Sequence, residues 1–232
     1  MYQSWNHISF LHWRCSPKIL QSRLPNGLGV DTCNGTGWIS ITPFLLEHLR
    51  PDHFPAIPWL SRFPETNLRT YVQGPRGPGI WFFSLDAARL PAVFGARAGF
   101  GLPYFWSRMD VTVEESGAQY RTDYTLRRSR QTFAKIRVRT LESMRQPDPL
   151  SRFLTARYRL YAIRLGQLIT VEVEHRPWPL WQAKVLECEQ TLTRAASLYA
   201  APHPDMVHFS TGVDVKVSFP QPIKAESELQ SS

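Results

Sequence analysis

Three polar side chains stand at alternate positions in a stretch that is rich in aromatic residues. They are Glu65, Asn67 and Arg69, within the segment FPETNLRTYV (63–72). Alternate residues of a strand point to one face, so a strand that begins at Glu65 places a carboxylate, an amide and a guanidinium together. Such a face can bind a small polar ligand, and a carboxylate in an apolar cavity can acquire a raised pKa suited to acid–base work. The competing interpretation is a solvated face or a structural ion pair between Glu65 and Arg69.

Two of the seven histidines lie where an apolar, strand-like run meets a loop. His175 and His208 could each face a pocket, although a lone histidine is more often a structural residue. Histidine and cysteine spacings typical of a metal site are missing, as are the GxSxG, Walker A and dinucleotide glycine motifs. The loop GPRGPG (74–79) is too rich in proline to cradle a phosphate, because proline lacks the amide donor. We therefore expect neither a metal nor a cofactor.

The residues around Glu65 predict a hairpin that is followed by a helix. The runs 67–72 and 80–85 predict strands on either side of the glycine- and proline-rich loop. Asp86 can cap a helix in the Ala-rich segment that follows, and the glycines and proline within 99–103 would end that helix.

The rest of the chain indicates a mostly antiparallel sheet. Apolar and polar residues alternate over 109–114, 120–127 and 134–139, which predicts three consecutive strands with one solvent-exposed face. Much of the arginine excess falls in these strands and is explained as their polar side. An apolar stripe at helical spacing predicts a helix from Ser151 to Leu165. The other predicted strands are 9–13, 28–32, 38–44, 168–175 and 213–219.

Length and composition predict one domain, residues 1–219, with a flexible C-terminal tail at 220–232. The 232 residues, of which 43% are hydrophobic, can bury a sizeable core, and no repeat or domain boundary is visible. The segment 48–64 is rich in proline and aromatic residues and predicts an ordered but irregular loop. The polar residues after 219 predict fraying.

Charge and cysteine content bear on the compartment and on partners. The formal charge of +8, from 27 Lys and Arg against 19 Asp and Glu, permits binding to nucleic acid. Three cysteines without a CxxC pair argue against a disulfide framework. No apolar run has the length of a transmembrane helix, and the first residues lack the pattern of a signal peptide. We expect a cytoplasmic protein that does not contact a membrane.

Eight segments, in order along nearly the whole chain, carry a resemblance to a known family. They are FLHW (10–13), LPNGLGVDTCNGTGWISITPF (24–44), FPETNLRTYV (63–72), GIWFFSLDA (79–87), FGLPY (100–104), RYRLY (157–161), PWPL (177–180) and HFSTGVDVKV (208–217). With these segments the chain resembles the YqjF-like family, a domain-of-unknown-function family of the acetoacetate decarboxylase-like superfamily. The resemblance implies an α+β fold that is mostly antiparallel: a cone-shaped β-barrel with a few helices outside.

The same resemblance implies where chemistry would take place. Acetoacetate decarboxylases form a Schiff base on a lysine that follows a Gly/Ala-x-Pro element. Here the matching element is GLP (101–103), and it is followed by Tyr104 and Phe105, neither of which can form an imine. The superfamily's active-site glutamate matches Glu65. We therefore expect no Schiff base, and we expect Tyr104 to line the pocket in place of the lysine and to donate a hydrogen bond to a carbonyl or enolate oxygen.

Three functions remain open from the sequence. The first is a small-molecule binding protein or enzyme that acts on a keto or carboxylic compound. Its candidate catalytic residues are Glu65 and Tyr104, and its candidate ligand-binding residues are Asn67, Arg69, His175 and His208. The second is a non-catalytic ligand-binding or regulatory protein that has inherited the fold. The third is nucleic-acid binding through the Arg-rich strands, which we do not expect because interleaved aromatic residues are missing. A homo-oligomer is left open.

Overall fold

The fold is seen in a computed structural model, which describes residues 1–51, 55 and 61–223. These residues form one 14-stranded sheet and four short helices. The strands are β1 (Tyr2–Cys15), β2 (Gly29–Val30), β3 (Gly37–Arg50), β4 (Phe63–Gly74), β5 (Gly77–Ala87), β6 (Tyr104–Trp106), β7 (Arg108–Ser116), β8 (Gln119–Arg127), β9 (Phe133–Ser143), β10 (Arg159–Arg164), β11 (Gln167–His175), β12 (Leu180–Gln190), β13 (Met206–Val217) and β14 (Gln221–Pro222). The helices are α1 (Pro17–Gln21), α2 (Leu90–Phe100), α3 (Pro149–Thr155) and α4 (Leu192–Ala195).

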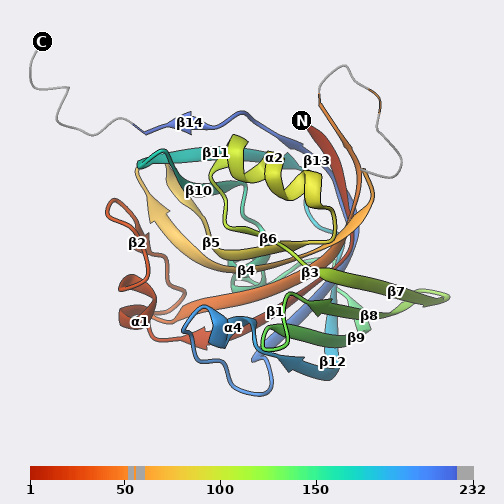
Figure 1. Cartoon of the computed structure of the whole chain (residues 1–232). Helices are drawn as coiled ribbons and strands as arrows, with labels where there is room; N and C mark the ends of the chain where they lie inside the picture. Colours follow the sequence, from red (N-terminus) through yellow and green to blue (C-terminus); the bar gives the residue numbers. More distant parts are fainter. Residues whose placement is uncertain (52–54, 56–60, 224–232) are drawn as a thin grey trace, which may run out of the picture.

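The sheet is mostly antiparallel and strongly curved. Its strand order is β14-β11-β10-β5-β4-β3-β1-β13-β12-β9-β8-β7, with β2 on β4 and β6 on β5. The pairs of β5 with β6 and β10 are parallel. β11 also pairs with β13, so seven strands pair in succession and return to the first. In Figure 1, α2 lies inside the curve of the sheet, and β7, β8, β9 and β12 extend to one side.

The central strands are buried on both faces. Leu11 of β1, Ile41 of β3 and Leu68 of β4 form a core with Tyr124 and Ile136 of the strands β8 and β9. The opposite face of β1, β3 and β4 looks into the curve of the sheet and belongs to a second core cluster. Strands covered on both sides show nearly continuous burial, as β4 does. This arrangement explains why β4 carries the apolar Leu68 between the polar Asn67 and Arg69.

The hairpin and the three-stranded meander predicted from the sequence are confirmed. β4 and β5 pair along their whole length around the glycine-rich turn. Gly74 is required there, since a Cβ atom would lie 2.5 Å from the Tyr161 ring. β7, β8 and β9 pair antiparallel in sequence order. Val138 of β9 is buried, while Lys135 and Arg139 on its other face are exposed, as the alternation predicts.

The helix predicted from Ser151 to Leu165 is wrong. Helix α3 ends at Thr155, and the chain continues as β10 from Arg159. Asp148 caps α3 by accepting hydrogen bonds from the backbone nitrogens of Leu150 and Ser151. β10 then pairs with β5 and β11, and its residues Leu160, Tyr161 and Ala162 are buried. The apolar spacing is compatible with both structures, so contacts distant in sequence decide between them.

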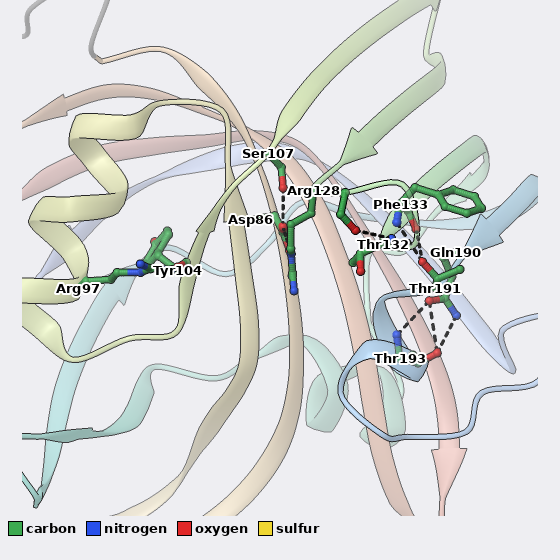
Figure 2. Close-up of polar contacts among 11 residues, drawn as sticks. Asp86, Arg97, Tyr104, Ser107, Arg128, Thr132, Phe133, Gln190, Thr191 and Thr193 are labelled. Atoms are coloured by element: carbon green, nitrogen blue, oxygen red, sulfur yellow. Dashed lines mark hydrogen bonds and ion pairs between the residues drawn. The ribbon is translucent and has the colours of Figure 1, made fainter.

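Asp86 does not cap α2, contrary to the prediction. It lies in β5, and α2 begins at Leu90 with Arg89 at the N-cap position. The buried Asp86 carboxylate instead accepts hydrogen bonds from Ser107 Oγ at 2.6 Å and Arg128 Nε at 2.7 Å, which Figure 2 shows. Asp86 therefore joins β5 to the segment after β6 and to the loop after β8.

Several predicted boundaries differ from the structure. The strands expected at 9–13 and 38–44 lie within the longer β1 and β3, whereas the strand expected at 28–32 is only the two residues of β2. Much of the loop expected at 48–64 lies outside the described residues. After residue 219, β14 still pairs with β11, and 224–232 are not described. In the described part of the chain, no helix has the length and hydrophobicity to cross a membrane.

Candidate functional site

A cavity of about 350 Å³ lies inside the curve of the sheet, next to α2. Strand β4 contributes alternate residues to its wall: Phe63, Glu65, Asn67 and Arg69. This is the geometry that a strand imposes, because every second side chain points to the same face. Tyr104 of β6 also lines the cavity. The structure therefore brings together the four residues on which the sequence prediction mainly depends.

Glu65 and Tyr104 are in contact inside this cavity. The Tyr104 hydroxyl lies 3.2 Å from each of the two carboxylate oxygens of Glu65. Burial raises the pKa of Glu65 to about 8, against the hydrogen bonds from Tyr104 and Asn67, which lower it. Burial, followed by the neighbouring Glu65, raises the pKa of Tyr104 well above its usual range. At neutral pH the carboxyl group is thus mostly protonated and the phenol is neutral.

The turn after α2 positions Tyr104. Gly101 adopts a left-handed conformation with φ of 66°, and a Cβ atom there would lie 2.4 Å from the carbonyl oxygen of Ile163. Only glycine fits both conditions. Beyond it, Tyr104 pairs in parallel with Leu85 of β5, and Arg97 Nε donates a hydrogen bond to the Tyr104 carbonyl at 2.6 Å (Figure 2). The strand pairing with Leu85 and the hydrogen bond from Arg97 therefore fix the backbone of Tyr104, which carries the phenol.

Arg69 is a buried cation without an acidic partner. Among the described residues, no carboxylate lies within 4.0 Å of its guanidinium. Its Nη2 donates to the Leu154 carbonyl at 3.3 Å, whereas its buried Nε has no hydrogen-bond partner in the described part of the chain. The expected alternative, an ion pair between Glu65 and Arg69, is therefore wrong. Burial lowers the pKa of Arg69, and an anion in the cavity would relieve this cost.

Beyond Arg69 the same face of the sheet carries a buried polar layer. His208 Nε2 lies 3.0 Å from Ser151 Oγ, and His208 Nδ1 lies 3.3 Å from His12 Nε2. The Nδ1 atom of His12 lies 2.5 Å from Ser40 Oγ, which lies 2.6 Å from the Tyr71 hydroxyl. Burial lowers the pKa of His208 to about 4 and that of His12 well below its usual range. His208 is therefore placed in this neutral layer and not in the cavity wall.

His175 lies behind the cavity wall. Its ring packs against Tyr158 and Trp178, with 4.7 Å between ring centroids in each pair. Trp178 lines the cavity, whereas His175 does not. Burial lowers the pKa of His175, so its ring is neutral at neutral pH. In the sequence, His175 stands where a strand meets a loop. That position does not tell whether a side chain lines a cavity or packs behind its wall.

Sequence reasoning missed two tryptophans and the inner face of α2. Trp5 and Trp178 lie with their rings stacked, 6.2 Å apart, and both line the cavity. Ala92 and Ala96 of α2 line it as well. The i, i+4 spacing of these two alanines could have indicated one helix face, but neither residue carries a chemical signal. The tryptophans come from segments far apart in the chain, so no local pattern joins them.

The raised pKa of Glu65 predicts a stability that depends on pH. The folded state holds the Glu65 proton up to about pH 8, whereas the ordinary pKa of a glutamate side chain is 4.5. Between these values the folded state holds the Glu65 proton and the unfolded state does not, so the contribution of Glu65 to stability falls as pH rises from 4.5 to about 8 and is level above. Glu65→Gln should remove this slope in melting temperatures recorded from pH 4 to 9. Glu142→Gln, at an exposed position of β9, should follow the wild type. Parallel curves for Glu65→Gln and wild type would contradict the raised pKa.

Comparison with known proteins agrees with this fold. The model of the family DUF2071, described as an uncharacterised conserved protein, matches residues 2–214. The chain belongs to the DUF2071 family. Its relative YqjF of Bacillus subtilis (strain 168) is 38% identical over 219 residues, which are 93% of this chain and 89% of YqjF. The resemblance inferred from the sequence is confirmed.

Solved structures similar to this DUF2071 chain are acetoacetate decarboxylase-like. An acetoacetate decarboxylase from Legionella pneumophila is 12% identical with a TM-score of 0.61, over 97% of this chain and 88% of that one. The enduracididine biosynthesis enzyme MppR complexed with pyruvate is 12% identical with a TM-score of 0.63, over 96% and 90% of the two chains. At this identity the likeness shows the fold: a mostly antiparallel sheet with few helices.

Proposed function

We propose that this DUF2071 protein binds a keto carboxylic acid in the cavity between β4 and α2 and exchanges a proton with it through Glu65. The observation that carries the proposal is the unpaired, buried guanidinium of Arg69, which lies in the same cavity as the Glu65–Tyr104 pair. A carboxylate on Arg69 supplies the missing anion in a geometry that suits a guanidinium. The carbonyl group then lies toward Glu65, along the row of β4 side chains.

The proposed chemistry needs no amine. Among the described residues that line the cavity there is no lysine, so the wall offers no lysine side chain for an imine intermediate. In its place, ionised Glu65 removes a proton from the carbon next to the ketone, and the electron pair forms an enolate. The Tyr104 hydroxyl turns from Glu65 to the carbonyl oxygen and stabilises the negative charge that develops there. Return of a proton from Glu65 to the same carbon restores the ketone.

The pairing of the strands supports an enclosed site. We infer that β11, β10, β5, β4, β3, β1 and β13, which pair in a closed succession, form the cone-shaped barrel that the family resemblance implies. The cavity lies on the inner face of this ring. A water-poor interior strengthens every charge interaction in it, which fits the raised pKa of Glu65.

Deuterium exchange tests the proposal. In D₂O, the wild type should incorporate deuterium beside the ketone of 2-oxobutanoate or 4-oxopentanoate, as followed by proton NMR. The rate should rise with pH through about 8, because ionised Glu65 is the base. Glu65→Gln should lower it roughly 100-fold or more, and Tyr104→Phe roughly 100-fold, while both variants still bind the acid. Binding without exchange above the buffer rate would contradict the catalytic part and favour a non-catalytic binding protein.

The Arg-rich strands favour the small-molecule proposal over nucleic acid. Lys135 lies 2.5 Å from Glu187, and Arg137 contacts Asp123 in a close ion pair. Arg121 also lies within ion-pair distance of a carboxylate, that of Glu114. Cations that already have acidic neighbours on the sheet surface are less available to phosphate groups.

A further inference from the structure

The cavity is larger than a three-carbon keto acid requires. Its volume of about 350 Å³ corresponds to roughly a dozen water molecules at their volume in the liquid. A ligand of the size of pyruvate would fill only a minor part of this space. Water would fill the rest of the cavity. Whether a larger ligand would replace that water depends on the chemistry of the cavity wall.

Most of the cavity wall is apolar and aromatic. It includes Phe44 and Phe82 from β3 and β5, Phe100 from α2, and the indole ring of Trp178. Water beside such a surface is unfavourable, and an apolar group that replaces it gains about 25 cal/mol for each Å² removed from water. The cavity therefore combines a few charged and polar groups, Glu65, Asn67 and Arg69 among them, with a larger apolar wall that favours hydrocarbon.

Small residues on α2 leave space in the cavity beside this helix. Ala92 and Ala96 lie one helical turn apart and both line the cavity. Gly95 lines it too, and a Cβ atom built on Gly95 would meet no atom within 4 Å. Gly95 is also exposed to solvent, so the cavity reaches the surface beside this turn of the helix. Larger side chains at these positions would occupy the volume that the walls leave open.

We propose that the ligand is a keto acid with an extended apolar body, a medium-length alkyl chain or an aromatic ring, which lies against α2 while its carboxylate contacts Arg69. This inference rests on the proposed function, because Arg69 and the Glu65–Tyr104 pair set the polar end. It adds the substrate class: the apolar body contributes most of the affinity, and the side chains of α2 set the longest body that fits.

A chain-length series tests the inference. Dissociation constants are measured by calorimetry for pyruvate, 2-oxohexanoate, 2-oxooctanoate, 2-oxodecanoate and phenylpyruvate. Affinity should rise about fourfold for each added methylene until the cavity is full, which corresponds to the transfer of that group out of water. Phenylpyruvate should bind more tightly than pyruvate. An affinity that does not change with chain length would overturn the inference and leave the proposed function standing.

Two matched variants on one helix locate the apolar body. Ala96→Leu places a larger side chain in the cavity and should lower the ratio of the affinities for 2-oxooctanoate and pyruvate tenfold or more. Ala98→Leu makes the same change on the same helix at an exposed position that does not line the cavity, and should leave the ratio as in wild type. Equal ratios in the two variants would overturn the placement against α2.

The primary alcohols of the same chain lengths separate the two proposals. Suppose that the keto acids bind no more tightly than the alcohols, but that the affinities of both series rise with chain length and fall in Ala96→Leu. The proposed function is then wrong, and the inference that the cavity binds an apolar body is supported. If the keto acids bind more tightly than the alcohols at every length, with the stated dependence on length, both are supported.

Discussion

Replacement of Arg69 by methionine should strongly weaken the binding of a short keto acid without a loss of stability. The guanidinium is buried, lacks an acidic neighbour within 4.0 Å among the described residues, and has an unsatisfied Nε. Methionine keeps much of the side-chain volume and removes the cost of burying this charge, so the folded state should be as stable as wild type or about 1–3 kcal/mol more stable. The Leu154 carbonyl keeps the hydrogen bond from the Tyr71 hydroxyl, at 2.8 Å. Affinity for 2-oxobutanoate should fall roughly 100-fold or more.

Arg157→Met is the matched control for this prediction. Arg157 also lines the cavity, but its Nη1 lies 2.7 Å from Asp31 Oδ2, and its Nε donates to the Phe153 carbonyl at 2.9 Å. Loss of a paired arginine leaves a partly buried carboxylate alone, so this variant should be less stable than wild type. Urea denaturation and calorimetry give the two quantities. A structural role for Arg69 would show as a loss of stability in Arg69→Met similar to that in Arg157→Met.

Replacement of Asp86 by alanine should produce the largest loss of stability. The carboxylate is completely buried and accepts three hydrogen bonds, one from Ser107 and two from Arg128. Its removal leaves the buried Ser107 hydroxyl without this acceptor and the Arg128 side chain, 17% exposed, without its counter-charge. Breaking a buried pair in this way costs 3–5 kcal/mol, and the partial exposure of Arg128 places our expectation at about 3 kcal/mol.

The Asp86 variant should also affect the cavity. Asp86 pairs with Phe105, the neighbour of Tyr104 in β6, and Arg128 packs on the Phe105 ring at 3.8 Å. A loosened β6 would misplace the Tyr104 hydroxyl, so the rate of deuterium exchange should fall as well. Asp123→Ala is the control, because Asp123 forms its ion pair with Arg137 on a solvated sheet face and should cost no more than about 1 kcal/mol. Equal unfolding free energies for the two variants would contradict the role of Asp86.

Local patterns predicted the parts of this protein that depend on strand geometry. The spacing of Glu65, Asn67 and Arg69 already implied one polar face, since a strand alternates its side chains wherever it lies in the fold. The meander over 109–139 was predicted for the same reason, and so was the hairpin around Gly74. The likeness of dispersed segments to a known family added the fold class and drew attention to Tyr104.

Other features could not be predicted, because they depend on which segments meet. The run from Ser151 to Leu165 has a helical apolar spacing. Part of it nevertheless forms β10, which pairs with β5 and β11 in the sheet. Asp86 had the residue type of a helix cap, but the approach of Arg128 gave its carboxylate a stronger partner. His208 had the residue type of a site residue, and contacts with His12 and Ser151 place it in the layer beyond the cavity.

By itself the sequence determined the chemical groups of the candidate site: a carboxyl, an amide and a guanidinium in one row, and the phenol of Tyr104 after the GLP element (101–103). Only the tertiary structure decided their state. Among the described residues it places no carboxylate within 4.0 Å of Arg69, it raises the pKa of Glu65 to about 8 by burial, and it sets both in a mostly apolar cavity of about 350 Å³. The physical reason is that residue types and strand alternation are local, whereas desolvation, charge pairing and empty volume are set by all the segments that surround a point in space.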